Sequence, residues 1–288
     1  ARSSMKGRQM RWFVCALVIL GFVPQASAAD LDILRGAEPV GPPTYTNWTG
    51  FYVGGDWGYT NDATDFSNAT NSLVSYSLRE TTLEQDDNVS SWSVLGNAST
   101  TTTTPSGFAG YNTQWQNLIL GLEADYTHAS SSATATSSPI SRQVSAGGNT
   151  YDVTVEGSAS VRLVDYASLR ARAGWILNNF LPYGFIGVVV GRGDVTRTSL
   201  VYGQENPSSP PVVPCDYTLS PTCVDFSYPN NESQNNALLY GGSVGIGLDY
   251  AVTSNIFLRG EFEYVRFLPL DDILVTMTSA RIGAGFRF

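Results

Sequence analysis

Apolar and polar residues alternate over long stretches of this chain, and this period of two constrains the fold more than any other feature. In 238–250 one set of alternate residues carries mostly leucine, tyrosine, valine and isoleucine, while half of the other set is glycine and its last residue is Asp249. In 278–288 alanine, isoleucine and phenylalanine alternate with arginine and glycine. Successive side chains of a β-strand point to opposite faces of the sheet. The pattern therefore predicts strands with one apolar face and one polar face.

The alternation recurs along the chain, although 181–191 is nearly apolar throughout. The segments are 50–60, 107–116, 118–127, 165–175, 181–191, 238–250, 256–266 and 278–288. Short connections alternate with longer ones, which we predict to be external loops at about 61–105, 129–160, 193–236 and 267–274. Outer-membrane barrels have short periplasmic turns and long external loops. We therefore predict an all-β fold, an eight-stranded antiparallel transmembrane β-barrel with both termini in the periplasm.

Aromatic residues near the predicted strand ends separate this barrel from a secreted β-sandwich, which would also show alternation. Membrane barrels carry aromatic girdles at the two membrane interfaces, and a sandwich needs none. The predicted girdle residues are Trp48, Tyr59, Trp115, Tyr126, Trp175, Tyr183, Tyr250 and Tyr264. No stretch after residue 28 is apolar for the 18 residues that a membrane helix would need.

The composition agrees with strands that face lipid on one side and a polar lumen on the other. Only 14% of the residues are charged, against roughly 25% in soluble domains, and yet the mean hydropathy is only −0.07. The net charge of −9 opposes binding to nucleic-acid phosphates. His128 is the one histidine, which excludes catalysis built on several histidines. We predict no enzyme activity, no cofactor and no metal site.

The first 28 residues have the layout of a secretory signal peptide. Four basic residues precede an apolar run from Trp12 to Val23, and the small-x-small sequence Ala26-Ser27-Ala28 follows. The run is too short for a membrane-spanning anchor, the alternative interpretation. Residues 1–4 precede the first methionine and are interpreted as an artefact. We predict a periplasmic linker over 29–47 and the barrel with its loops over 48–288.

Removal of the signal peptide leaves 12 arginines, no lysine and 25 carboxylates, a net charge of −13. Two cysteines remain, Cys215 and Cys223, eight positions apart in the long loop 193–236. In an exported protein such a pair is expected to form a disulfide. A metal pair is the alternative, but no third cysteine or nearby histidine supports it.

Several short motifs, in this order and spacing, resemble the outer membrane immunogenic protein family of alphaproteobacteria. They are Trp48–Gly55 (WTGFYVGG), Gly110-Tyr111-Asn112, Gly121–Asp125 (GLEAD), Asp165-Tyr166 with Leu169–Gly174 (LRARAG), Glu261–Tyr264 (EFEY) and Arg281–Phe288 (RIGAGFRF). The resemblance implies an abundant, immunogenic, structural eight-stranded barrel, with pore activity claimed for some members. The long loops 61–105 and 193–236 and the cysteine pair depart from the family pattern.

Arginines and carboxylates share the polar face of the predicted strands. We predict that they form an ion-pair network in the lumen, made of Asp56, Glu123, Asp125, Arg170, Arg172, Asp249, Arg259, Glu261, Glu263, Arg281 and Arg287. Arginine suits bidentate pairing with carboxylates, which favours a packed plug over a narrow ion path. The carboxylate pairs Glu261/Glu263 and Glu123/Asp125 could also serve a hydrolase, but neutralisation by arginine explains them better.

The sequence predicts a structural surface protein of the bacterial outer membrane. The alternatives are a small-solute porin with a narrow charged lumen, a loop-mediated receptor or adhesin, and an accessory subunit of a larger membrane assembly. Expected partners are outer-membrane lipid and lipopolysaccharide, the barrel assembly machinery and a membrane protein. The assembly machinery would recognise the terminal Phe288 with Phe286.

Overall fold

The computed structural model describes residues 47–92, 94–206 and 223–288. The chain divides into two units, 1–43 and 44–288, and the described residues belong to the second. The predicted signal peptide and the predicted linker up to residue 46 lie outside the described residues. No helix among the described residues is long and apolar enough to cross a membrane.

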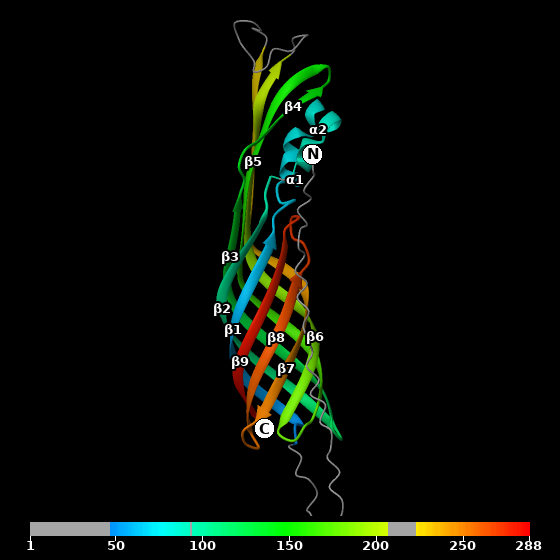
Figure 1. Cartoon of the computed structure of the whole chain (residues 1–288), viewed down its shortest axis with the longest axis vertical. Helices are drawn as coiled ribbons and strands as arrows, with labels where there is room; N and C mark the ends of the chain where they lie inside the picture. Colours follow the sequence, from blue (N-terminus) through cyan, green and yellow to red (C-terminus); the bar gives the residue numbers. More distant parts are fainter. Residues whose placement is uncertain (1–46, 93, 207–222) are drawn as a thin grey trace, which may run out of the picture. The chain divides into compact units, whose positions relative to one another are not determined.

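Nine antiparallel strands and three short helices make up the described part of the chain (Figure 1). The strands are β1 (Gly50–Asp65), β2 (Asn97–Trp115), β3 (Leu118–Thr136), β4 (Ile140–Ala146), β5 (Asn149–Trp175), β6 (Phe180–Asn206), β7 (Val224–Ala251), β8 (Ile256–Phe267) and β9 (Leu274–Arg287). The helices are α1 (Asn71–Leu78), α2 (Thr82–Asp87) and the 3₁₀ helix η1 (Val89–Ser91).

Eight of the strands close into a ring, which confirms the predicted fold class. Each strand pairs with the next along the chain, except that β3 pairs with β5 and β9 pairs back with β1. The ninth strand, β4, pairs with β5 outside the ring. Closure leaves the strands of the ring without a free edge at the level where they all pair.

One end of the ring carries the short connections, and we call it the turn end. It contains the β2–β3, β5–β6 and β7–β8 turns together with Trp48 and Phe288. In each turn the backbone oxygen of an asparagine accepts a hydrogen bond from a backbone N–H at the end of the adjacent strand or just beyond it. Asn117 accepts from Ile176, Asn179 from Ala251 and Asn255 from Arg287. These bonds tie the turns into one rim. We call the opposite end the loop end.

Three of the four predicted loop boundaries are wrong, because the strands continue far into the segments expected to be loops, whereas the fourth, 267–274, agrees with the structure. β1 runs to Asp65 and β2 begins at Asn97, inside 61–105. β3, β4 and β5 occupy most of 129–160, and β6 and β7 extend through much of 193–236. β8 and β9 are joined by 268–273, with a bridge between Leu270 and Ile273.

A row of β-bulges crosses the four strands β3, β5, β6 and β7 at the level where the closed ring ends. The register shifts between His128 and Ser131 on β3, between Leu163 and Asp165 on β5, and between Gly193 and Val195 on β6, where β7 also gains residues. Leu163 pairs with both Ser131 and Gly193, so the bulges are adjacent. Bulges bend a sheet and increase its twist.

Beyond these bulges the wall becomes a separate sheet, which we call the ribbon. It consists of β4 with the parts of β3, β5, β6 and β7 that lie on the loop side of the bulges (Figure 1). β2 and β3 pair only up to Ser106 and Thr127, and β7 and β8 only up to Gly241 and Phe267. The ribbon therefore separates from β1, β2, β8 and β9.

The connection between β1 and β2 covers one face of the ribbon. This segment, 66–96, contains α1, α2 and η1, and we call it the cap; α2 packs on β4, and α1 packs on β6 and β7. Its buried side chains are Phe66, Ala69, Leu73, Val74, Leu78, Leu83, Val89, Trp92, Val94 and Leu95. They pack against alternate ribbon residues such as Tyr151, Val153 and Val155. The loop end thus has a hydrophobic core of its own.

Candidate functional site: the interior of the barrel

The interior of the barrel is built in three layers, in the same order on several strands. On β8, moving from the turn end, Phe257 is followed by Arg259, Glu261 and Glu263, and then by Val265 and Phe267. The aromatic layer at the turn end consists of Trp48, Tyr52, Phe108, Ile119, Ile176, Leu181, Tyr183, Phe185, Ala251 and Phe257. The apolar layer at the loop end is continuous with the core under the cap. Charged residues lie between two apolar layers.

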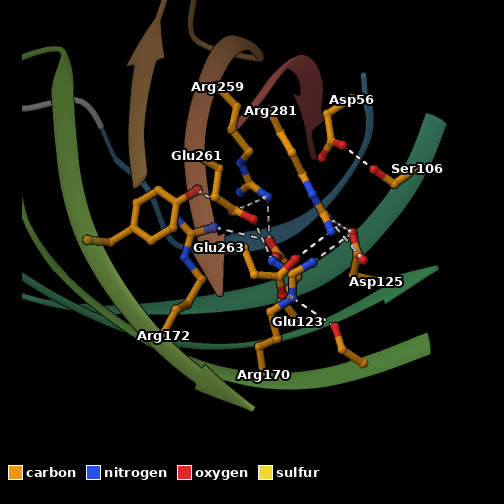
Figure 2. Close-up of polar contacts among 12 residues, drawn as sticks. Asp56, Ser106, Glu123, Asp125, Arg170, Arg172, Arg259, Glu261, Glu263 and Arg281 are labelled. Atoms are coloured by element: carbon orange, nitrogen blue, oxygen red, sulfur yellow. Dashed lines mark hydrogen bonds and ion pairs between the residues drawn. The ribbon is translucent and has the colours of Figure 1, made fainter. Parts of the chain in front are cut away.

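Four arginines bridge strands that are not neighbours in the wall (Figure 2). Arg170 lies 2.6 Å from Glu261 and 2.8 Å from Asp125. Arg281 lies 2.5 Å from Glu263 and 3.3 Å from Asp125. Each guanidinium therefore contacts two or more carboxylates, the arrangement that its planar fork of donors favours.

The other two arginines share their carboxylates. Arg172 lies 2.7 Å from Asp249 and 3.3 Å from Glu123. Arg259 lies 2.7 Å from Glu123 and 2.9 Å from Asp249. The four arginines and their five carboxylate partners are only 0–5% exposed. We call these nine residues the ionic layer: Glu123, Asp125, Arg170, Arg172, Asp249, Arg259, Glu261, Glu263 and Arg281.

Tyrosine hydroxyls and aromatic rings join the ionic layer to the layers beside it. The Tyr52 hydroxyl donates to Glu123 at 2.8 Å, and the Tyr183 hydroxyl donates to Glu261 at 2.9 Å. The Arg259 guanidinium lies 3.9 Å from the centre of the Phe108 ring, and the Arg172 guanidinium 3.8 Å from that of Tyr183. These contacts give the buried tyrosine hydroxyls carboxylate partners and cover the flat faces of the two arginines.

Glycines on the inner face make room for the aromatic layer. A Cβ at Gly245 would overlap the Phe185 ring, and one at Gly247 would overlap the Tyr183 ring. The same relationship holds for Gly54 with Phe108, Gly110 with Tyr52, and Gly285 with Phe257. Five rings therefore lie over glycines of neighbouring strands. These five glycines make room for aromatic rings.

Asp56 lies at the side of the ionic layer. Its carboxylate accepts a short hydrogen bond from the Ser106 hydroxyl, as Figure 2 shows. Arg287 was predicted to belong to the ion-pair network of the lumen, but no ion pair links it to the ionic layer. It donates to the backbone oxygen of Ser254 and lies over the Trp48 ring at 4.8 Å, at the turn end. As the last residue of β9, Arg287 lies on the turn-end side of the carboxylates of the ionic layer.

Two predicted girdle residues, Trp48 and Tyr183, also require correction. Both are buried in the interior, at 1% and 6% exposure. Trp48 precedes the first strand, so alternation did not define its direction, and Tyr183 lies in the nearly apolar segment 181–191. The remaining predicted girdle side chains are exposed on the outer surface: Tyr59, Trp115, Tyr126, Trp175, Tyr250 and Tyr264. Phe286 and Phe288 are also exposed, with ring centres 5.2 Å apart.

Three residues with buried polar contacts were not among the predicted site residues: Tyr52, Tyr166 and Arg197. Tyr52 and Tyr166 donate or accept inside the barrel; Arg281 lies 2.5 Å from the Tyr166 hydroxyl. The alternation held a signal for Tyr52, which lies opposite the outward-facing Phe51. The third is Arg197, which is 3% exposed beneath the cap. No local signal distinguished Arg197 from an exposed arginine.

Arg197 of β6 fastens the cap to the ribbon. Its Nη1 donates to the backbone oxygen of Ala69 and to the Ser72 hydroxyl, each at 3.0 Å. The same nitrogen donates to the backbone oxygen of Asp271 at 3.2 Å, and Nη2 pairs with Glu232 of β7. One side chain thus joins the cap, the ribbon and the β8–β9 connection.

Two further predictions concern the cysteine pair and a metal site. The disulfide between Cys215 and Cys223 stays a prediction, since Cys215 lies outside the described residues. Among residues 47–92, 94–206 and 223–288, no group of three or more histidine, cysteine, aspartate and glutamate side chains is placed to hold a metal ion.

A closed ring of antiparallel strands, apolar outside and charged within, defines the class of outer-membrane β-barrel proteins. Residues 13–288 match the family described as outer membrane protein beta-barrel domain, and the chain belongs to that family. It is an integral protein of the bacterial outer membrane.

The chain is similar to two curated proteins of Brucella, each described as a 31 kDa outer-membrane immunogenic protein. The one from Brucella melitensis is 24% identical over 97% of this chain and 100% of its own length, and the one from Brucella suis matches to the same extent. These matches confirm the resemblance seen in the sequence motifs. Among solved structures, Neisserial surface protein A is 16% identical, covers 83% of this chain and 98% of its own, and has a TM-score of 0.36.

Proposed function

We propose that this protein is a structural component of the outer membrane whose barrel is closed to solutes and whose loop end is displayed as a surface antigen. One observation carries the proposal: nine charged side chains, paired with one another, fill the middle of the barrel between two apolar layers. An eight-stranded barrel has an interior that side chains can fill. A continuous water path would have to pass through all three layers.

The energetics of the ionic layer favour a plug over a channel. Charges removed from water are tolerated only when they are paired and hydrogen-bonded. Every arginine of the layer meets at least two carboxylates, and aromatic rings cover several of the guanidinium faces. An ion that entered the layer would have to break these contacts. Their mutual pairing also leaves no field of a single sign to select ions.

The proposed orientation places the turn end in the periplasm and the loop end outside the cell. Barrels of this class have short periplasmic turns and long external segments. Both described ends of the ring, Trp48 and Phe288, lie at the turn end. The exposed Phe286 and Phe288 would then meet the assembly machinery from the periplasm, and the ribbon and cap would rise through the lipopolysaccharide.

Planar-bilayer recording on the purified full chain tests the proposal. Folded protein, verified by its heat-modifiable shift on gels, is expected to give no conductance steps of porin size. A known porin treated identically serves as the positive control. Reproducible steps from folded protein, changed in size by a substitution in the ionic layer, would establish a narrow charged channel in place of the plug.

A further inference from the structure

The face of the ribbon that points away from the cap carries a groove unrelated to the barrel interior. Residues 151, 153 and 155 of β5 are buried beneath the cap, and the alternate residues Asp152, Thr154 and Glu156 lie on the opposite face. A cleft of about 790 Å³ lies there, over β4, β5, β6 and β7. A second cleft of about 230 Å³ shares Glu156 and Leu200 with the first. Together they form one elongated groove.

The strand register sets the dimensions of the groove. Cross-strand pairs from Asp152–Gln204 to Ser158–Thr198 line it along β5 and β6. Six residues of strand correspond to about 20 Å at 3.3 Å per residue. The groove is therefore long and narrow, the shape of a site for a chain of linked units and not for one compact molecule.

Hydroxyl, amide and carboxylate groups dominate the lining. Ser141, Thr154, Tyr202 and Ser227 pair side by side across four adjacent strands, so that their hydroxyls form a row. The neighbouring row contains Asp152, Gln204 and Asp225. Hydroxyls both donate and accept, amides do the same with separate atoms, and carboxylates accept only. Such a surface suits a ligand that presents many hydroxyl groups.

Tyr202 lies near the middle of the groove and is held in position. Its hydroxyl donates to Glu156 at 2.7 Å, and that hydrogen bond raises the pKa of the Tyr202 phenol, so the group remains a donor at neutral pH. The body of a tyrosine ring is apolar. It can pack against the C–H face of a sugar ring while the surrounding polar groups meet the sugar hydroxyls.

The chemistry of the groove excludes other ligand classes. No arginine, lysine or histidine lines it among the described residues, and it carries carboxylates, which disfavour sulfated, phosphorylated or sialylated ligands. A peptide could not join as an added strand within the groove, because β5 and β6 are already flanked by β4 and β7 there. Leu200 is the one large aliphatic side chain that lines it among the described residues, which leaves little surface for a lipid tail.

The ribbon is preformed for binding. Its covered face packs on the cap core, and Gly203 brings β6 so close to β5 that a Cβ there would overlap the backbone of Asp152. A rigid sheet loses little conformational freedom when a ligand binds. We propose that this groove binds an uncharged oligosaccharide, with Tyr202 as the ring against which a sugar packs. In the orientation proposed above, the site would face the cell exterior.

The experiment uses the full chain in a polyoxyethylene detergent, because detergents with sugar head groups would compete. An array of uncharged, sialylated and sulfated oligosaccharides, including polysaccharide fragments from the producing bacterium and glycans of animal cells, is probed with wild-type protein. Calorimetry on the strongest uncharged oligosaccharide then compares wild type with Tyr202→Leu and Tyr76→Leu. Tyr76 is an exposed tyrosine of the cap, 63% accessible, and provides the matched control.

Binding to uncharged glycans is expected, with at least a tenfold loss of affinity for Tyr202→Leu and no change for Tyr76→Leu. The origin of the bound glycans distinguishes a bacterial ligand from a host ligand. The proposal is overturned if no uncharged glycan binds, if only acidic glycans bind, or if Tyr202→Leu binds like wild type. The gel shift verifies folding of each variant, and Thr154→Val, a substitution of similar size, serves as a second groove variant if Tyr202→Leu fails to fold.

Discussion

Arg170 of β5 forms an ion pair with Glu261 of β8, with 2.6 Å between Nη1 and Oε1, although β6 and β7 lie between these strands in the wall. The contact crosses the barrel interior. Each such pair links segments that are far apart both in the sequence and around the ring. The ionic layer therefore fixes the barrel cross-section in a way that neighbouring-strand hydrogen bonds alone do not.

Replacement of Arg170 should destabilise the barrel strongly. Arg170→Met would leave the buried Asp125 and Glu261 without their shortest cationic contact. Removal of one partner of a buried ion pair lowers the free energy of unfolding by about 3–5 kcal/mol. Unfolding by urea in micelles, followed by the gel shift, measures the effect. Arg162→Met, at an exposed position of the same strand, is the control and should change stability little. Equal midpoints for the two variants would contradict a structural role for the ionic layer.

Filling the space beneath an aromatic ring should also destabilise the barrel. Gly245→Ala would force the Phe185 ring from its place, whereas Gly260→Ala adds a methyl group with no neighbour within 4 Å. Overpacking typically costs about 1–3 kcal/mol. We expect a lower unfolding midpoint for Gly245→Ala and an unchanged one for Gly260→Ala. If both variants unfold like wild type, the rings do not depend on the glycines.

Loss of Arg197 should release the cap and leave the barrel folded. Hydrogen bonds to charged groups contribute about 1.5–3 kcal/mol each. In Arg197→Met we expect amides of α1 to exchange with deuterium at least tenfold faster, while the barrel unfolds at the wild-type midpoint. Gln85→Met, at an exposed position of α2, should leave the exchange unchanged. Unaltered exchange in Arg197→Met would show that apolar packing alone holds the cap.

The cap should also respond to acid. The Gln234 amide and the Arg197 guanidinium hold the pKa of Glu232 below its ordinary value. A depressed pKa means that the contact stabilises the folded state above the ordinary glutamate range and is lost as the pH falls through the folded-state pKa. The protection of α1 amides, expressed relative to the intrinsic exchange rate at each pH, should therefore fall at low pH in wild type, and less so in Glu232→Gln. An equal loss of protection in both would exclude Glu232 as the titrating group.

The sequence was sufficient to predict the ring of eight strands and the charged inner face, because lipid on one side and a polar interior on the other impose alternation. It was insufficient at the loop end. The threonine-rich start of β2 is polar on both faces, so its strand structure left no trace in the pattern. In β5 the signal did exist, since Tyr151, Val153 and Val155 alternate with polar residues, but it indicates packing against a cap that is at least 55 residues away in the sequence.

The charged site shows the same division. Inner-face position predicted which carboxylates and arginines share the interior, but not which partners meet, because partners such as Arg259 and Glu123 come from strands separated by 136 residues. Arg287 shares the inner face with Arg281 and yet belongs to the turn end, since height along the barrel decides its neighbours. Periodicity gives the face of a residue, and only the closed ring gives its height relative to other strands.

The shared core of the cap and ribbon has a consequence for immune recognition. The cap and the ribbon parts of β3, β4, β5, β6 and β7 complete this core together, so its surface combines parts of the chain that are distant in the sequence. A synthetic peptide copied from 66–96 alone would expose the apolar side that the ribbon normally covers. Antibodies raised against such a peptide would recognise a shape that the folded protein does not present, so an antigen intended to elicit antibodies against this end of the folded protein would need the ribbon and cap together.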